Sequence, residues 1–419
     1  MKVLLVSYSD IMGGASRACL RLHRALLAEG VESHLVCSNP KTEERNVHRA
    51  FSYMGKYGGK IRPLLDEWIR KIRGHGEVPQ WTVDQVPGSL RRLVRKYKPD
   101  VVNLHFVNAG YLPIEAIRDV GVPIVWTLHD MWAFTGGCHY AGKCIKYQAR
   151  CGACPQLNSG VVDDLSWNVW NRKNRSWGDV KFEVVTPSNW LGECARSSTL
   201  FGSRNISVIP YSINLDVFTV LDQILYRKKL GLPRDKKLIL FGAASHLSDR
   251  RKGFDLLLSA LGHLKTQDLH QNLHLVVFGS DTLPPVVGDL GYTSQCMGKL
   301  TREEDIAALY GACDVFAAPS REDNLPNTVI ESLACGTPVV AFDTGGMPDM
   351  IEHLRVGYLA KPFDIQDFAK GIHQLTNVES PERKDVRDRC RKRTCELYHD
   401  EIQATAYLKL YYTMLAGVS

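Results

Sequence analysis

Two acidic residues near the end of a predicted strand are the first candidates for chemistry. Asp323 and Glu331 are separated by seven residues, in a polar segment that follows the apolar run 315–319. A helix is predicted to begin near Asn327, which puts Glu331 one turn into it. Backbone N–H groups at a helix start can hold an anion or a hydroxyl, and carboxylates accept hydrogen bonds from sugar hydroxyls. The segment is therefore either a binding site of this kind or a surface helix whose acids are incidental.

A group of four cysteines is the second candidate. Their spacing is C-x5-C-x6-C-x2-C, within an insert over 136–157. Four thiolates can form a closed structural zinc site, and a C-x2-C pair is typical of one. The alternative is four free or redox-active thiols. The four residues are Cys138, Cys144, Cys151 and Cys154.

Strands that alternate with helices must position these residues in both halves of the chain. Alternation of this kind predicts parallel sheets covered on both faces. Ligands of such sheets bind outside the carboxyl ends of the strands. The predicted fold is therefore α/β, with two Rossmann-like doubly wound domains that face each other across a cleft. The predicted strands are 2–7, 31–37, 101–106, 124–128 and 182–186 in the first half, and 237–242, 273–279, 315–319 and 338–342 in the second.

The domain boundaries follow from this alternation. A chain of 419 residues has room for two or three domains. We predict a first domain over 1–205 that contains the insert, and a second domain over 206–395. The tail over 396–419 is predicted to be a helix that returns to the first domain.

The acidic segment resembles the C-terminal signature of the retaining family 4 glycosyltransferases of the GT-B fold. Their signature has two acids at this separation, followed by a helix and a Gly-Thr-Pro-Val-Val strand, which stands here at 336–340. The first acid is usually Glu in the family and is Asp323 here. The insert resembles one found in a subgroup from exopolysaccharide and colanic-acid-type gene clusters. The resemblance implies that the first domain holds the acceptor and the second holds the nucleotide sugar.

The resemblance also assigns roles along the rest of the chain. His129, at the end of a predicted strand, is similar to the family's active-site histidine. Lys252 stands in the diphosphate-binding stretch, and because Leu247 occupies the place of the family's arginine, Arg250 or Arg251 is expected to replace it. The implied catalytic residues are His129, Lys252, Asp323 and Glu331. The implied donor-binding residues are Gly13, Gly14, Arg250, Arg251, Lys252, Gly279, Asn324, Leu325, Pro326, Asn327 and Glu331.

The function that the resemblance implies is transfer of a sugar, with retention, from a nucleotide-diphosphate sugar to a lipid-linked glycan acceptor. The family mechanism needs no protein nucleophile, and the leaving diphosphate takes the acceptor proton. We expect no cofactor to be required for catalysis, because cationic side chains can do the work of a metal ion. The alternatives are a GT-B sugar-nucleotide epimerase and a non-catalytic nucleotide-sugar-binding protein.

An uneven distribution of charge suggests an anionic partner. The net charge is +7, and residues 56–98 hold eleven Lys/Arg against four Asp/Glu, a difference of +7. Within this block, residues 61–73 read as an amphipathic helix with an apolar stripe of Ile, Leu and Trp. Such a helix either lies on an anionic membrane surface or packs its stripe on the domain core. We expect no nucleic-acid partner.

The N-terminal run 3–7 is too short for a signal peptide, and no run approaches the length that spans a bilayer. The sequence therefore predicts a cytoplasmic protein, with peripheral attachment to the inner face of the cell membrane as a further possibility.

Overall fold

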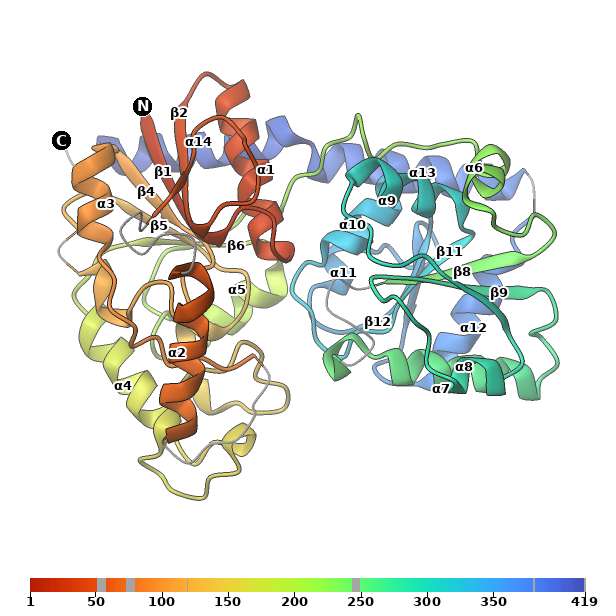
Figure 1. The fold of residues 1–419 in the computed structure, drawn as a ribbon, viewed down its shortest axis with the longest axis horizontal. Helices are drawn as coiled ribbons and strands as arrows, with labels where there is room; N and C mark the ends of the chain where they lie inside the picture. Colours follow the sequence, from red (N-terminus) through yellow and green to blue (C-terminus); the bar gives the residue numbers. More distant parts are fainter. Residues whose placement is uncertain (51–57, 73–79, 119, 243–248, 380, 418–419) are drawn as a thin grey trace. The chain divides into compact units, whose positions relative to one another are not determined.

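The chain forms two compact units in a computed structural model, which describes residues 1–50, 58–72, 80–118, 120–242, 249–379 and 381–417. Unit 1 comprises Met1–Tyr211 and Asp400–Ser419, and unit 2 comprises Ser212–His399 (Figure 1). The sequence placed these divisions after residues 205 and 395. A Pro- and Asn-bearing turn over 209–214 contains the first division.

Unit 1 is built on a seven-stranded parallel sheet of order β3-β2-β1-β4-β5-β6-β7. The strands are β1 (Lys2–Ser9), β2 (Glu32–Asn39), β3 (Val47–Arg49), β4 (Val101–Leu104), β5 (Ile124–Thr127), β6 (Glu183–Thr186) and β7 (Ile206–Val208). The α-helices are α1 (Gly14–Ala28), α2 (Gly58–Ile72), α3 (Leu90–Tyr97), α4 (Leu165–Trp177), α5 (Asn189–Arg196) and α14 (Asp400–Ala416).

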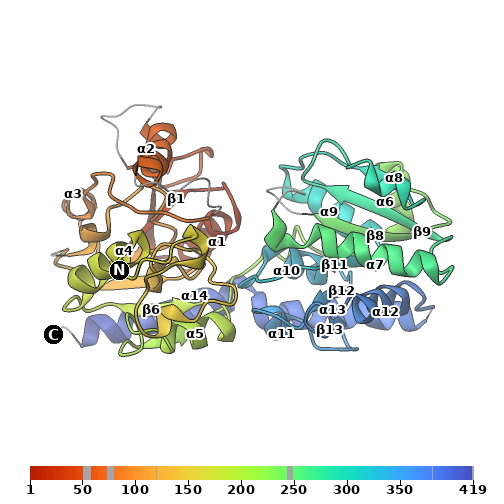
Figure 2. The ribbon, with the colours of Figure 1, turned by 90° about the horizontal axis from the view of Figure 1, so that it is seen from below.

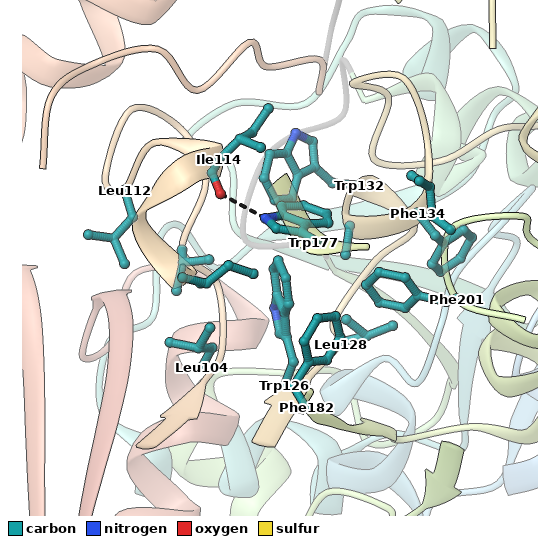
Figure 3. Close-up of a cluster of buried hydrophobic side chains, with 14 of the residues drawn as sticks. Leu104, Leu112, Ile114, Trp126, Leu128, Trp132, Phe134, Trp177, Phe182 and Phe201 are labelled. Carbon is teal, nitrogen blue, oxygen red and sulfur yellow. Dashed lines mark hydrogen bonds between the residues drawn. The ribbon is translucent and has the colours of Figure 1, made fainter. Parts of the chain in front are cut away.

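Both faces of this sheet are buried. Leu4 and Val6 belong to one hydrophobic core, while their neighbours Val3 and Leu5 belong to another. Successive side chains of a strand point to opposite faces, so the sheet separates two cores, as a doubly wound fold requires. One of these cores includes an aromatic cluster around Trp126 on β5 (Figure 3). Trp177 packs against the Trp126 ring edge-on at 4.9 Å between centroids, and fixes this end of β5.

The C-terminal helix α14 covers the other face of the sheet (Figure 2). The Tyr411 hydroxyl accepts a hydrogen bond from the Asn103 amide at 2.7 Å, and the Tyr407 hydroxyl lies 2.9 Å from that of Thr127. These contacts join the tail of the chain to β4 and β5, the two strands that precede His105 and His129.

Unit 2 repeats the scheme with a six-stranded parallel sheet of order β10-β9-β8-β11-β12-β13. The strands are β8 (Lys237–Gly242), β9 (Leu273–Phe278), β10 (Thr293–Cys296), β11 (Val315–Ala318), β12 (Val339–Phe342) and β13 (Gly357–Ala360). The α-helices are α6 (Gln223–Leu230), α7 (Phe254–Thr266), α8 (Val286–Asp289), α9 (Glu303–Ala312), α10 (Asn327–Ala334), α11 (Met347–Met350), α12 (Ile365–Thr376) and α13 (Glu382–Tyr398). The predicted α/β class with two Rossmann-like sheets is confirmed.

The prediction omitted four of the strands, β3, β7, β10 and β13. The sequence made 182–186 the last strand of the first half, whereas β7 (Ile206–Val208) follows it and pairs with β6. Its three residues are each half-buried at the sheet edge, so no apolar run marks them.

Candidate functional site

The centre of the candidate site in unit 2 is the carboxylate of Asp323, in the loop between β11 and α10. Asp323 is only 6% exposed. Its Oδ2 lies 2.5 Å from Lys252 Nζ, and its Oδ1 lies 3.1 Å from Arg251 Nη1. Burial disfavours the charged form, but the two cations outweigh it and lower the pKa of the Asp323 carboxyl to about 2. Two cations and one carboxylate thus form an ion cluster that is charged at neutral pH.

The backbone before this cluster decides which arginine takes part. Residues 250–252 form a 3-10 turn capped by Asp249, whose side chain accepts a hydrogen bond from the Arg251 amide at 3.0 Å. The turn directs Arg251 toward Asp323 and Glu322, whose carbonyl accepts a hydrogen bond from Arg251 Nη1 at 3.0 Å. Arg250 is exposed. Of the two predicted replacements, Arg251 is therefore the one beside Lys252 and Asp323.

Glycine at 253 is what lets Lys252 come so close to β11. Gly253 has φ +71°, and a Cβ there would lie 1.9 Å from the carbonyl oxygen of Pro319. The backbone conformation and the close approach both exclude a larger residue. Lys252 then lines a small pocket together with Gly242, Pro326 and Thr328. Gly242 ends β8 and the other residues follow β8 or β11, at the carboxyl edge of the sheet.

The other predicted donor residues of unit 2 lie at or near this edge. Asn324 and Leu325 are buried beside Asp323, and Pro326 is the residue before α10. Glu331 is 3% exposed and lies one turn into α10. Gly279 follows β9, the neighbour of β8, with φ +90°, and its amide donates to the Gly298 carbonyl at 2.8 Å.

The predicted glycines of unit 1 lie at the switch point of its sheet. Gly13 follows β1, adopts φ +84° and precedes α1, whose first residue is Gly14. A Cβ on Gly13 would meet nothing within 4 Å, so the backbone conformation alone favours glycine there. Strand β1 lies between β2 and β4, where the strand order reverses direction. Open α/β sheets bind ligands at this place.

His129 is held in a hydrogen-bonded chain with two residues that it meets only in the folded protein. Its Nε2 lies 3.0 Å from His105 Nδ1, and its Nδ1 lies 2.6 Å from the Tyr211 hydroxyl. Burial lowers the pKa of His129 to about 4 and lowers that of His105 well below its usual value. Both imidazoles are therefore neutral at neutral pH, and a ligand at this place meets no positive charge from them.

Two residues of this region were not predicted as site residues. Tyr211 was considered only as part of the turn between the domains. His139 belongs to the insert, and its Nδ1 lies 2.8 Å from Asp130 Oδ2. A pattern search could have selected His139 because it adjoins Cys138, but no local signal pairs it with Asp130.

The four cysteines of the insert differ in burial. Cys151 and Cys154 are buried, while Cys138 and Cys144 are half-buried. Burial raises the pKa of the Cys138 and Cys151 thiols to about 12 in each case. Among the residues that the structure describes, no group of three or more His, Cys, Asp or Glu side chains is arranged to hold a metal ion. Structural zinc stays a prediction.

The predicted amphipathic helix exists as α2, but three of its charged residues, Arg62, Asp66 and Arg70, are buried, and most of its apolar stripe is exposed. Arg62 is 2% exposed and donates to the carbonyls of Gly110 and Tyr111 at 2.8 and 2.9 Å. Asp66 accepts from the amides of Val83 and Asp84. The exposed apolar side chains of α2 are Ile61, Leu64, Leu65, Trp68 and Ile72. The alternative that the whole stripe packs on the core is wrong for these five.

No helix in the described part of the chain is long and apolar enough to cross a membrane.

Comparison with known proteins agrees with this architecture. The family model for glycosyl transferases group 1 matches residues 222–393, and that for Glycosyltransferase Family 4 matches residues 12–217. Over its whole length the chain is similar in fold to sucrose-phosphate synthase from Thermosynechococcus elongatus, with a TM-score of 0.69, 19% identity and 100% of both chains covered. Anabaena HepE in complex with UDP-glucose has a TM-score of 0.62 at 16% identity, covering 99% of this chain and 100% of that one. The fold and the two matches define a glycosyltransferase of the GT-B class.

Curated relatives extend the similarity in sequence. A putative colanic acid biosynthesis glycosyl transferase, WcaC of Escherichia coli K12, is 22% identical over 91% of this chain and 95% of its own length. D-inositol 3-phosphate glycosyltransferase of Mycolicibacterium smegmatis is 27% identical over 67% of this chain and 60% of its own length. The chain belongs to the family 4 glycosyltransferases.

Proposed function

We propose that this glycosyltransferase takes a sugar from a nucleotide-diphosphate sugar and transfers it, with retention, to a hydroxyl of a glycan acceptor in polysaccharide biosynthesis. The observation that carries the proposal is the ion cluster of Lys252, Arg251 and Asp323 beside the pocket at the carboxyl ends of β8 and β11. A nucleoside diphosphate leaves as an anion, and two fixed cations at a strand edge suit its departure.

The reaction would need no cofactor and no protein nucleophile. The bond between the anomeric carbon and the diphosphate oxygen breaks, and the acceptor oxygen bonds to the same face of that carbon. The acceptor proton passes to the departing diphosphate. In this proposal Lys252 and Arg251 stabilise the charge that develops on the diphosphate, and the Glu331 carboxylate accepts hydrogen bonds from the donor's ribose. His129, neutral and held by His105 and Tyr211, contacts the transferred sugar.

The proposed pathway rests on the relatives. WcaC is named for colanic acid biosynthesis, and HepE was solved with UDP-glucose. We therefore propose a nucleotide-sugar donor and a lipid-linked glycan acceptor, as in the assembly of an exopolysaccharide.

The test uses purified protein, UDP-, GDP- and dTDP-sugars, and lipid-linked oligosaccharide extracted from cells that make such a polymer. We expect nucleoside diphosphate release that depends on the extract, and NMR of the product should show the anomeric configuration of the donor. Conversion of the donor without extract would instead identify an epimerase. Binding without turnover would identify a binding protein, and an inverted product would contradict retention.

We further propose that α2 attaches the enzyme peripherally to the inner face of the cell membrane, where a lipid-linked acceptor would lie. Leu64 and Trp68 are 62% and 59% exposed on a helix at the periphery of unit 1 (Figure 2). On the opposite side of the helix, buried Arg62 and Asp66 attach α2 to the rest of unit 1. An apolar face fixed outward in this way suits insertion at a lipid surface.

Charge on the same unit favours an anionic membrane. Exposed basic residues lie on α2 and α3 (Lys71, Arg91, Arg92, Arg95 and Lys96), and each Lys or Arg near an anionic surface contributes about 1 kcal/mol. Arg62 and Arg70 of the same block are buried and are not among them.

Vesicle co-sedimentation tests this attachment. The protein should bind vesicles that contain phosphatidylglycerol, and added salt should weaken binding. Full burial of a large apolar side chain contributes about 1.5–3 kcal/mol, so Leu64→Asp combined with Trp68→Asp should lower binding by at least tenfold. Ile224→Asp is the matched control, because Ile224 is 69% exposed in unit 2. Wild-type binding by the double variant would refute the role of α2.

A further inference from the structure

A buried carboxylate, that of Asp10, lies where the chain leaves β1 in unit 1. Asp10 is 0% exposed. It directly follows Ser9, the last residue of β1, and Ser9 pairs with Asn39, the last residue of β2. The loops after these two strands therefore start side by side at the carboxyl edge of the sheet. The proposed function makes no use of Asp10.

The Asp10 carboxylate joins the two loops to each other. Its Oδ2 accepts hydrogen bonds from the Lys41 amide at 2.8 Å, the Thr42 amide at 2.7 Å and the Thr42 hydroxyl at 2.8 Å. Its Oδ1 accepts one from the Ile11 amide at 3.0 Å and one from the Ser9 hydroxyl at 3.2 Å. Burial raises the pKa of the Asp10 carboxyl, but the hydrogen bonds from Thr42 and Lys41 outweigh it and hold the pKa below its ordinary value.

The loop after β1 is fixed by the side chains at its start. Besides the Ile11 amide, which donates to Asp10, the Met12 amide donates to Ser9 Oγ at 3.3 Å. Gly13 comes next with φ +84°, and a Cβ on it would meet nothing within 4 Å. Packing of a side chain therefore does not hold Gly13 in place, and the bonds to Ser9 and Asp10 fix the backbone that leads into it.

The chemistry of Asp10 argues against direct contact with a diphosphate. A carboxylate repels another anion. A carboxylate also has about four lone-pair positions for hydrogen bonds, and the amides and hydroxyls of the two loops already occupy them. Asp10 can therefore act on a reaction only through the loops that it holds.

We propose that Asp10 is a positioning residue for sugar transfer, which fixes the loop that leads into Gly13 and Gly14 against the loop after β2. The effect on transfer rests on the proposed function, whereas the joining of the two loops rests on the hydrogen bonds alone.

Asp10→Asn tests the proposal, because it replaces one carboxylate oxygen by an amide group that cannot accept a hydrogen bond. Hydrogen exchange of the full chain, followed by mass spectrometry, should be faster than in wild type over residues 9–14 and 40–45. A displacement of about 1 Å can lower a rate by about 10²-fold, so kcat/KM for the nucleotide sugar should fall by at least about tenfold. The Kd of free nucleoside diphosphate should stay unchanged, because the cations assigned to the diphosphate, Lys252 and Arg251, belong to unit 2.

Asp164→Asn is the matched control. Asp164 is also a buried carboxylate of unit 1, 7% exposed, and it caps α4 by accepting from the Ser166 and Trp167 amides at 2.9 and 3.1 Å. Its replacement should lower stability as Asp10→Asn does, but should leave kcat/KM as in wild type. Thr42→Val removes a single donor to Asp10 and should show the changes of Asp10→Asn at smaller size, so it decides the question if Asp10→Asn does not fold.

The outcomes separate this proposal from that of the transferase reaction. If Asp10→Asn leaves exchange in the two loops unchanged, or if Asp10→Asn and Asp164→Asn have the same kcat/KM, Asp10 has a structural role only and the proposal is wrong. Wild-type protein that transfers no sugar from any donor would refute the proposed function instead, and the exchange data alone would then decide whether Asp10 joins the two loops.

Discussion

Replacing Lys252 by alanine should abolish most of the transferase activity while the protein stays folded. Lys252 is the cation nearest to Asp323, at 2.5 Å, and it lines the pocket at the ends of β8 and β11. In Lys252→Ala the Asp323 carboxylate keeps Arg251 at 3.1 Å as its partner, so the buried charge is not left alone. The loss should therefore fall on the reaction rather than on folding.

The size of the effect follows from the charge of the cluster. Lys252, Arg251, Asp323 and Asp249 together carry no net charge, and removal of Lys252 leaves a net charge of −1. A unit charge about 4 Å from the diphosphate is worth about 4 kcal/mol at an effective dielectric constant of about 20. Loss of one preorganised stabiliser typically lowers the rate by about 10²–10³-fold. We expect kcat/KM to fall within that range.

Release of nucleoside diphosphate under single-turnover and steady-state conditions measures this effect. Arg250→Ala is the matched control. Arg250 stands two positions before Lys252 and carries the same charge, but its side chain is exposed. Its kcat/KM should stay within about threefold of wild type. Equal activity of Lys252→Ala and Arg250→Ala would refute the reasoning, and so would a loss explained by unfolding of Lys252→Ala in a thermal scan.

Three other predictions concern Asp323, His129 and the four-cysteine insert. The pKa of Asp323 is lowered to about 2 in the folded protein, so its ionised form adds stability that is complete above about pH 5 and is lost as the pH falls toward 2. Asp323→Asn should therefore be less stable than wild type by about 2 kcal/mol at pH 7. Urea unfolding should show this difference in stability closing below pH 3. His129→Ala should leave the Kd for nucleoside diphosphate unchanged by calorimetry but lower sugar transfer, and equal loss of both would place His129 at the nucleotide instead. Elemental analysis of protein purified without a metal-affinity tag should find about one zinc per chain in the four-cysteine insert; four titratable thiols and no zinc would favour the free-thiol alternative.

The sheets could be predicted because their strands are buried on both faces. Val3, Leu4, Leu5 and Val6 are all fully buried, and a continuous apolar run is what such a strand requires. The edge strands β3 and β7 could not be found in this way, because their residues are only half-buried and show no apolar run. The need for glycine at 253 could not be predicted either, because it arises from the close approach to the Pro319 carbonyl, 66 residues away in sequence.

The site residues could be predicted only where they lie close together in one segment of the sequence. Arg251 could not be distinguished from Arg250, because the 3-10 turn that orients them is decided by the Asp249 cap. The partners of His129 lie 24 and 82 residues away in sequence, and no local periodicity relates them. The burial of Arg62 could not be predicted, because the carbonyls to which it donates lie 48 and 49 residues away in sequence.

The most direct test of a nucleotide-sugar donor site is calorimetric titration of the wild-type chain with UDP, GDP and dTDP, followed by the matching sugar nucleotides. Saturation at 100 times the Kd adds about 2.7 kcal/mol to stability, so a thermal scan provides an independent reading. We predict that one nucleotide binds with one site per chain, that its sugar form binds at the same site, and that Lys252→Ala weakens both. Absence of binding by all three nucleotides and their sugars at millimolar concentration would contradict it.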